Sequence, residues 1–185
     1  MSANRIVRMA AAVAFLVLAS ACGTTDASDP EPQAQAPSTT AFPFPFPGKA
    51  PRQPVEGFGT ISYRISTMPA AERCALLAES LLQRSRGLMN RTDLGGFDGM
   101  LFVWDSDSSG GFWMKDTPLP LSIAWFDASG RFVSAADMEP CVGKDSCPNY
   151  DPAGPYRYAL EVPQGGLAVL GIRPGSVMTP GGPCT

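Results

Sequence analysis

The sequence predicts a mainly β protein: a small barrel or sandwich-like domain with one or two short helices, preceded by a signal peptide and a disordered Pro-rich linker. The 185 residues include 19 glycines and 19 prolines, which leaves little room for long helices. Short apolar segments alternate with turn residues about every ten positions, a spacing typical of sandwiches and barrels. A hydrophobic content of 44% is ordinary for a globular protein and excludes a wholly disordered chain.

Residues 1–21 have the pattern of a signal peptide. Arg5 and Arg8 precede a run of small or apolar residues that extends from Met9 to Ala21. As a helix this run would span about 20 Å, less than the roughly 30 Å hydrocarbon core, so we expect a cleaved signal rather than a membrane span. The segment from Leu18 to Cys22 resembles a bacterial lipobox with its Leu one position early. We therefore expect lipidation of Cys22 and anchoring at the outer face of the cell membrane. A plain secretory cleavage is the alternative.

Residues 22–56 are predicted to be a linker. Eight of the 19 prolines lie between Gly23 and Glu56, where aliphatic side chains are almost absent. The repeat from Phe42 to Pro47 lacks alternate N–H donors, which predicts an extended spacer. Binding of this repeat to a partner or to the domain's own surface remains the other interpretation. The folded domain is expected over residues 57–185.

Within that domain, turn and cap residues define the elements. Asp127-Ala128-Ser129-Gly130 predicts a hairpin loop. Ser80 can cap a helix at residues 81–86 with Gly87 as its stop, and a second short helix is expected at residues 165–170. The expected strands are residues 61–65, 75–79, 100–104, 112–115, 121–126, 132–136, 156–162 and 176–179.

The chain contains no histidine, which excludes Ser-His-Asp and Cys-His catalysis and the commonest zinc sites. Loss of the two signal arginines would change the net charge from −3 to −5, so no basic patch for nucleic acid is expected. Nucleophile, phosphate-loop and dinucleotide motifs are also missing from the sequence. No cofactor is implied.

Four cysteines remain in the domain, an even number that suits an oxidising compartment. Three connectivities are possible. Cys141 and Cys147 lie six residues apart in one loop and form the natural local pair, which leaves Cys74 for Cys184. A redox-active Cys141/Cys147 couple is an alternative, although the spacing differs from that of thioredoxin-type sites.

Several blocks between Cys74 and Cys184 resemble the signature blocks of the bacterial and archaeal family known as domain of unknown function 192. The resemblance implies a compact, mainly β barrel or sandwich-like domain, often exported, with no established biochemical activity. The two cysteines at its ends resemble the actinobacterial branch. The blocks are Arg86–Arg91, Gly99–Val103, Phe112–Thr117, Pro120-Leu121, Met138–Cys141 and Ala159–Val162.

Polar residues around the block from Phe112 to Thr117 form the leading candidate site. A cation, one or two carboxylates and an aromatic wall would suit a polar or sugar-like ligand. Thr117 belongs to the same polar set, and Glu161 is a further acid that can lie near it. Ion pairs that only fasten loops are the alternative. The candidate ligand-binding residues are Arg91, Trp113, Lys115, Asp116 and Glu139.

Two metal hypotheses are weaker. Asp105, Asp107, Ser109 and Asp116 resemble the oxygen spacing of a calcium loop, but strands rather than helices are expected on both sides. A solvated hairpin turn is the simpler interpretation. Methionine thioethers are soft ligands suited to Cu(I), although core packing is their usual role. These methionines are Met89, Met100, Met114 and Met138.

The expected function is a non-catalytic lipoprotein module of the cell envelope that binds a small molecule or an envelope protein. The alternative from another class is a carboxylate-dependent hydrolase of envelope carbohydrate or peptide, using Asp116 with Glu139 or Glu161. A cavity that unites two carboxylates would favour the enzyme.

Overall fold

The computed structural model describes residues 51–185. The predicted signal peptide, Cys22 and the Phe-Pro repeat lie outside the described residues. The packed part of the chain begins before residue 57, where the sequence predicted the end of the linker. Val55 is buried in the core, and the backbone N–H of Gln53 donates to the Gly95 carbonyl at 2.8 Å.

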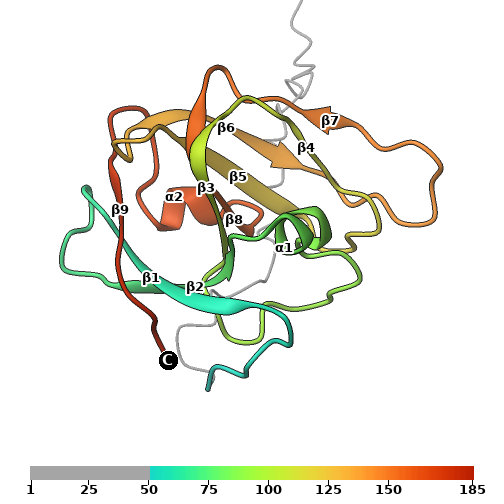
Figure 1. The fold of residues 1–185 in the computed structure, drawn as a ribbon, viewed down its shortest axis with the longest axis horizontal. Helices are drawn as coiled ribbons and strands as arrows, with labels where there is room; N and C mark the ends of the chain where they lie inside the picture. The colour runs from blue at the N-terminus through green and yellow to red at the C-terminus, as the bar shows by residue number, and fades with distance from the viewer. Residues whose placement is uncertain (1–50) are drawn as a thin grey trace, which may run out of the picture. The chain divides into compact units, whose positions relative to one another are not determined.

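The domain is mainly β, with a curled seven-stranded sheet, a separate two-stranded sheet and two short helices (Figure 1). The strand order in the large sheet is β6-β5-β8-β3-β2-β1-β9, and only the β2–β3 pair is parallel. The predicted fold class is confirmed. The elements are β1 (Gly59–Ile65), β2 (Arg73–Ala78), α1 (Leu81–Arg86), β3 (Met100–Ser108), β4 (Phe112–Trp113), β5 (Leu121–Phe126), β6 (Phe132–Met138), β7 (Asn149–Tyr150), β8 (Tyr156–Pro163), α2 (Gly166–Val169) and β9 (Met178–Pro180).

The large sheet curls until its two edge strands meet at one end. The N–H of Phe132 donates to the Ser176 carbonyl at 3.0 Å, and the N–H of Met178 donates to the Gly130 carbonyl at 2.8 Å. Gly130 closes the predicted β5–β6 hairpin with φ +74°, a conformation that favours glycine. A Cβ there would lie 2.0 Å from the Met178 carbonyl oxygen. The absence of a side chain at this position therefore lets the two edges approach.

A core cluster lies on each face of the sheet. Alternate residues of a strand point to opposite sides, so a single interior strand can contribute to both clusters. In β5, Ile123 and Trp125 pack in one core cluster, whereas Ala124 and Phe126 pack in the other. This explains why the β5 segment is an almost continuous apolar run. One of these cores also contains Phe102 of β3, and the candidate site described below lies on that side.

Helix α1 spans the predicted residues. The Ser80 hydroxyl accepts from the Gln83 N–H, and the Gln83 side chain accepts from the Ser80 N–H, which together form a capping box. Gly87 follows with φ +47°. None of the helices in the described part of the chain is long and apolar enough to cross a membrane.

The segment after β3 differs from the prediction. Strand β3 continues to Ser108, so Asp105 and Asp107 lie in a strand instead of a hairpin turn. Strand β4 has two residues rather than four and pairs with β7, which the sequence analysis missed. Strand β4 ends early because the chain turns near Asp116, which adopts φ +50°. The two residues of β7 are too few to carry an alternating pattern.

Two disulfides join the expected cysteine pairs. Cys74 of β2 is bonded to Cys184 across 110 residues, which attaches the C-terminal segment to the sheet. Cys141 is bonded to Cys147 and closes a short loop beside β4, where Lys115 bridges to Cys141. None of the four thiols is therefore free as a nucleophile in this structure.

Candidate functional site

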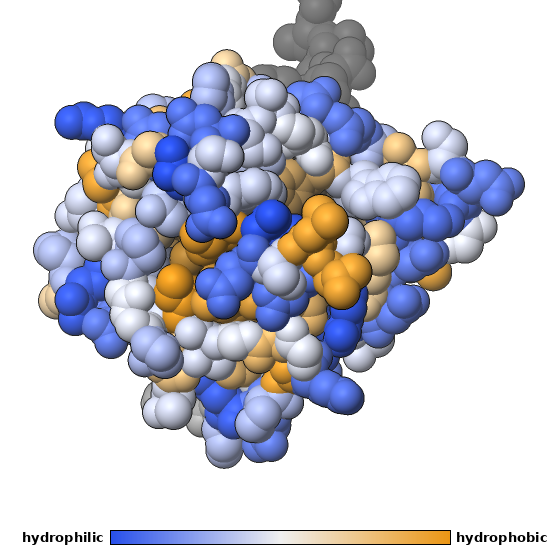
Figure 2. Space-filling model, in the orientation of Figure 1, coloured by the Kyte–Doolittle hydropathy of each residue, from blue (hydrophilic) through white to orange (hydrophobic). Residues whose placement is uncertain are grey.

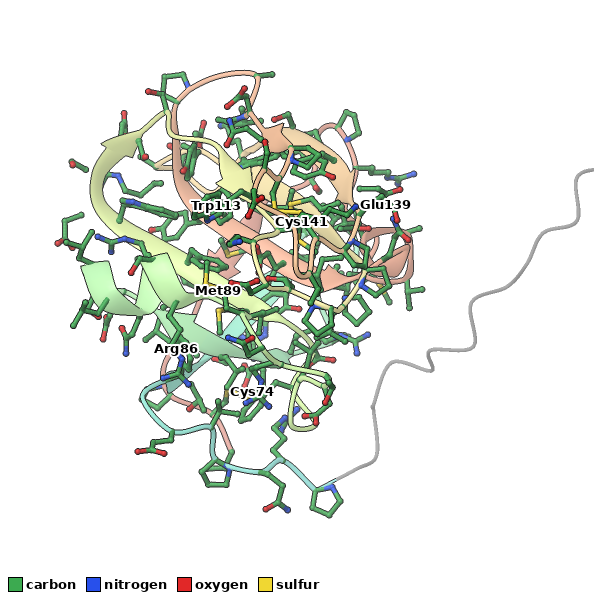
Figure 3. All side chains as sticks on the ribbon, turned by 90° about the vertical axis from the view of Figure 1, so that its right-hand side faces the viewer. Cys74, Arg86, Met89, Trp113, Glu139 and Cys141 are labelled. Carbon is green, nitrogen blue, oxygen red and sulfur yellow. A yellow bond between two sulfur atoms is a disulfide. The ribbon has the colours of Figure 1, made fainter. Side chains whose placement is uncertain are left out.

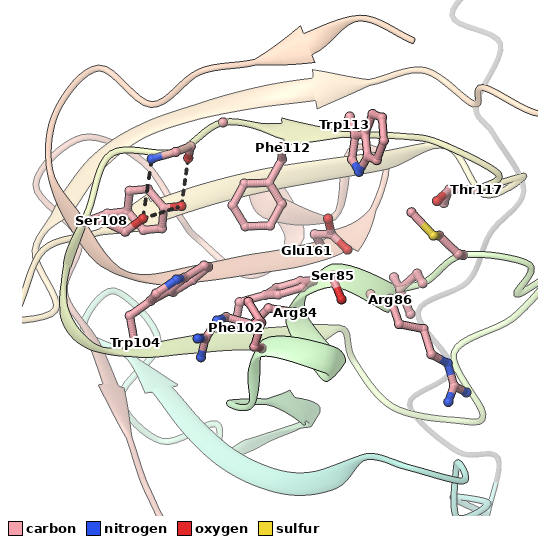
Figure 4. A pocket seen from close by; sticks show the side chains of 17 residues that line it. Arg84, Ser85, Arg86, Phe102, Trp104, Ser108, Phe112, Trp113, Thr117 and Glu161 are labelled. Carbon is pink, nitrogen blue, oxygen red and sulfur yellow. Dashed lines mark hydrogen bonds between the residues drawn. The ribbon is translucent and has the colours of Figure 1, made fainter. Parts of the chain in front are cut away.

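A cavity of about 320 Å³ opens between α1 and β4, above strands β3 and β8 (Figure 4). This volume lies at the lower end of the range for small-molecule sites, about 300–1,000 Å³. Aromatic rings and a few polar side chains share the lining. The lining residues are Leu81, Arg84, Ser85, Arg86, Gly87, Leu88, Met89, Phe102, Trp104, Ser108, Gly110, Gly111, Phe112, Trp113, Thr117, Tyr156 and Glu161.

Glu161 supplies the only carboxyl group among the described lining residues. It lies on the interior strand β8, in register with Met100 of β3 and Ile123 of β5, and both of those neighbours are fully buried. Glu161 itself is only 5% exposed. Figure 4 shows its carboxyl group between Phe112 and Thr117, facing the cavity.

Burial alone raises the pKa of Glu161 from 4.5 to about 8. A charged carboxylate is poorly solvated in such surroundings, and no described residue compensates with an ion pair or a hydrogen bond. Asp98 provides a contrast in the same domain. It is similarly buried, but Arg73 lies 3.5 Å from its Oδ1 and the Cys74 N–H donates to its Oδ2 at 2.9 Å. Glu161 is thus a buried acid without an ion-pair or hydrogen-bond partner among the described residues.

The aromatic walls of the cavity come from β3 and β4. The rings of Phe102 and Trp104 stack at 25°, and Phe112 stands nearly perpendicular to both, at 89° and 74°. Residues 102 and 104 share a face because they are two positions apart in one strand. Trp113 is 55% exposed and lies at the rim, beside Thr117 in Figure 4.

The other polar side chains of the lining are largely committed to the protein. The Ser85 hydroxyl donates to the Leu82 carbonyl at 3.0 Å, and the Thr117 hydroxyl donates to the Lys115 carbonyl at 3.2 Å. The Tyr156 hydroxyl donates to the Gly110 carbonyl at 2.8 Å. Neither the Ser85 nor the Thr117 hydroxyl forms a hydrogen bond to Glu161, the only carboxyl group of the described lining.

The two arginines of the lining are also occupied. The Arg84 guanidinium donates to the carbonyls of Glu79 and Val103 and lies 5.1 Å from the Trp104 ring centroid. The Arg86 guanidinium donates to the Glu56 carbonyl at 3.2 Å and lies over Phe58. Neither guanidinium forms an ion pair with Glu161, and burial is the only cause of the raised pKa of Glu161.

Of the five candidate ligand-binding residues, Trp113 alone lines this cavity. Lys115 donates to the Lys144 carbonyl at 2.8 Å, and its ammonium lies 3.9 Å from the Asp116 carboxylate. Arg91 pairs with Asp93 at 3.2 Å. Glu139 accepts from Gln164 at 3.0 Å and lies at the edge of the domain, apart from Met89 and Trp113 (Figure 3). These four residues fasten loops, which is the simpler alternative for them.

The structure does not assemble the calcium-loop pattern. Asp105 and Asp107 lie on β3, and Asp107 pairs with Arg157 at 2.9 Å. Ser109 follows that strand, whereas Asp116 lies beyond β4. The described residues contain no cluster of three or more Cys, Asp or Glu side chains able to hold a metal ion.

The methionines of the Cu(I) hypothesis divide between the core and the cavity. Met100, Met114 and Met138 are buried in the core cluster, which is their usual role. Met89 lines the cavity.

Sequence reasoning missed most of the aromatic lining and gave Glu161 a minor place. The available signal for Glu161 was an isolated acid within the apolar run from Tyr158 to Val162, on a strand expected to be buried. For Phe102 and Trp104 the available signal was their spacing of two positions in one expected strand, which places both side chains on the same face. The leucines of α1 are exposed in the structure: Leu81, which lines the cavity, by 75%, and Leu82, outside the lining, by 80%. Figure 2 shows hydrophobic surface at this position.

The fold and the cavity define a mainly β domain with an aromatic site around one buried acid. Residues 65–180 match the model of the family DUF192, described as an uncharacterized ACR, and the chain belongs to this family. No curated protein matches the chain.

Two solved structures are similar in fold. One is a protein of unknown function from Novosphingobium aromaticivorans, 26% identical, which covers 74% of this chain and 97% of its own with a TM-score of 0.57. The other is described as a candidate transcription regulator from Sinorhizobium meliloti, 23% identical, which covers 72% of this chain and 98% of its own with a TM-score of 0.55. The second likeness shows the fold alone.

Proposed function

We propose that this protein is a non-catalytic module of the cell envelope that binds a small molecule in the cavity above β3 and β8. The observation that carries the proposal is Glu161, a buried carboxyl that faces an aromatic cavity with no partner among the described residues. Buried polar groups in proteins are normally hydrogen-bonded or paired. A ligand that supplies the missing partner explains why an acid occupies this position.

The composition of the lining favours binding over hydrolysis. Paired-carboxylate hydrolysis requires two acids about 5–10 Å apart across the substrate. The described lining has one, and the earlier candidates Asp116 and Glu139 lie outside it. The Ser85 and Thr117 hydroxyls donate to backbone carbonyls instead of to a carboxylate, and the four described cysteines are disulfide-bonded.

The test is ligand retention by the full chain, exported by a bacterial host and purified in a mild nonionic detergent. Native mass spectrometry should detect a small molecule that dissociates from the folded protein. Ser85→Trp places an indole at the cavity mouth from an exposed helix position and should abolish retention. Leu82→Trp, on the same helix but outside the cavity lining, is the matched control. Equal retention by both variants, or none by the wild type, would contradict the proposal.

The proposal includes export and lipid anchoring at Cys22. The signal-like N-terminus and the lipobox-like segment support it, and so do two disulfides of the kind that persist in oxidising compartments. An actinobacterial origin is consistent with the cysteines at the ends of the domain. Metabolic labelling with palmitate should mark the wild type and leave Cys22→Ser unlabelled. Equal labelling of the two proteins would exclude a lipid on Cys22.

A further inference from the structure

The unpaired carboxyl of Glu161 constrains the kind of ligand that the cavity accepts. Met100 and Ile123 flank it in register on the neighbouring strands, so the protein itself offers apolar side chains next to the acid. Glu161 is only 5% exposed, and it lines the cavity. A ligand in the cavity would therefore become the principal partner of this group.

The aromatic walls favour a positively charged partner. The π-face of an aromatic ring carries negative potential, and cations within about 6 Å of a ring centroid are attracted to it. Phe102 and Phe112 stand almost perpendicular, so they present two differently oriented ring systems beside the acid. Trp113 adds an exposed indole at the rim.

None of the other charged or titratable side chains of the described lining pairs with the Glu161 carboxyl group. These side chains are Arg84 and Arg86 from α1 and Tyr156 from β8. The residues that strands β3, β4 and β5 place on this side are apolar: Phe102, Phe112 and Ile123. Both arginines bond to backbone carbonyls and lie over aromatic rings at 5.1 and 4.9 Å. Arg84 over Trp104 already shows a cation on a ring of the lining.

We propose that the cavity binds a small organic cation of the alkylammonium class, with its charged head group beside the Glu161 carboxylate and its alkyl groups against the aromatic rings. This inference rests on the proposed function, since it names the ligand class of the same site. Binding is coupled to ionisation. Glu161 gives up its proton to the buffer, and the resulting carboxylate pairs with the cation, so no other reactant is needed.

The raised pKa of Glu161 makes this coupling measurable. With a pKa of about 8, the acid is mostly protonated at neutral pH. Binding of one cation should therefore release about one proton at neutral pH, and the affinity should rise as the pH approaches 8. Calorimetry in two buffers of different ionisation enthalpy measures the released proton directly.

The probes are choline and tetramethylammonium, compared with dimethylbutanol, the uncharged carbon isostere of choline. Isothermal titration of the full chain at millimolar probe concentration should show both cations binding at least about tenfold more tightly than the alcohol, a difference of about 1.4 kcal/mol. Glu161→Gln keeps the shape of the side chain and removes its charge. It should weaken choline binding at least about tenfold, abolish proton release and leave dimethylbutanol binding unchanged. Glu139→Gln, an exposed carboxyl outside the cavity lining, is the control and should bind choline as the wild type does.

Each contrary result has a distinct meaning. Equal binding of choline and dimethylbutanol, or choline binding that survives Glu161→Gln without proton release, would overturn the cation proposal while the cavity remains a binding site. No binding of either cation would also overturn it. The proposed function fails separately, if the wild-type protein retains no small molecule or if Ser85→Trp retains as much as Leu82→Trp. Far-ultraviolet circular dichroism of each variant verifies that it is folded.

Discussion

Glu161 is a buried acid with no ion pair or hydrogen bond among the described residues. A carboxylate in water loses its solvation when it enters a buried strand, and a buried acid usually recovers part of that loss through an ion pair or hydrogen bonds. Asp98 does so with Arg73 and the Cys74 N–H. Glu161 instead remains protonated near neutral pH, which makes it sensitive to pH and to ligands.

The first prediction concerns the pH dependence of stability. The pKa of Glu161 is raised in the folded state, so between about pH 4.5 and 8 the unfolded chain binds fewer protons than the folded one. The free energy of unfolding should therefore fall as pH rises through this window, with a contribution of up to about 1.4 kcal/mol per pH unit, and level off above it. Thermal melts of wild type and Glu161→Gln measure this term.

Glu161→Gln should remove this part of the slope, because an amide does not ionise. The two proteins should have similar melting temperatures near pH 4.5, and the variant should be the more stable of the two near pH 8. Parallel melting curves across the whole range would show that Glu161 ionises freely in the folded protein. Glu139→Gln controls for the loss of an exposed acid.

At the scale of elements, a helix cap and two disulfides fix the positions of the segments on both sides of the cavity. The capping box of α1 places Arg84 and Ser85 at the cavity, and the Cys141–Cys147 loop receives the Lys115 ammonium just beyond β4. The Cys74–Cys184 disulfide acts over a longer range, since it attaches the end of the chain to β2. These devices fasten the elements on both sides of the cavity.

The second prediction compares the two disulfides. The chain-entropy model assigns about 5 kcal/mol to a loop closed across 110 residues and about 2 kcal/mol to one closed across six. Replacing Cys74 and Cys184 by Ala should therefore lower the free energy of unfolding by more than replacing Cys141 and Cys147. Each pair has one almost fully buried cysteine, at 2% and 1% exposure, so the loss of packing is similar.

Urea denaturation of the two double variants provides the measurement. Equal losses, or a larger loss from the short loop, would mean that the Cys74–Cys184 bond does little to restrict the unfolded chain. Labelling of the unreduced wild type with iodoacetamide should leave all four of these thiols unmodified.

For the whole molecule, closure of the curled sheet depends on contacts between its two edges. The strands that meet, β6 and β9, are separated by 39 residues and join through the segments around Gly130 and Val177. A sheet edge that meets another edge is protected from pairing with a second chain. Closure therefore contributes both to stability and to solubility.

The third prediction tests this closure. Gly130→Ala forces a left-handed alanine and a Cβ 2.0 Å from the Met178 carbonyl oxygen, so it should destabilise the fold by at least about 2 kcal/mol. Gly143→Ala is the matched control: its φ is +65°, but no atom lies within 4 Å of the added Cβ. It should cost only about 1 kcal/mol.

Urea denaturation and light scattering measure the two variants. Equal stability of Gly130→Ala and Gly143→Ala would show that the edge contact contributes little. We expect a larger aggregated fraction for Gly130→Ala than for Gly143→Ala, because a sheet edge that is no longer covered can pair with another chain.

The sequence by itself determined the family and much of the local structure, but not β7 or the lengths of β3 and β4. Helix α1 with its Ser80 cap, the hairpin at Asp127–Gly130 and the mainly β class follow from short-range preferences, because caps and turns form hydrogen bonds within a few residues. The cysteine pairing also followed, once the close spacing of Cys141 and Cys147 left one other pair.

Only the tertiary structure decided which side chains meet in the cavity. Strand register brings Glu161 of β8 beside Met100 and Ile123, and the pairing of β4 with β7 places Phe112 and Trp113 above it. Lys115 and Asp116, adjacent to these aromatics in sequence, instead fasten the disulfide loop. The reason is physical: local preferences act over a few residues, whereas the neighbours of a strand residue depend on pairing partners far away in the chain.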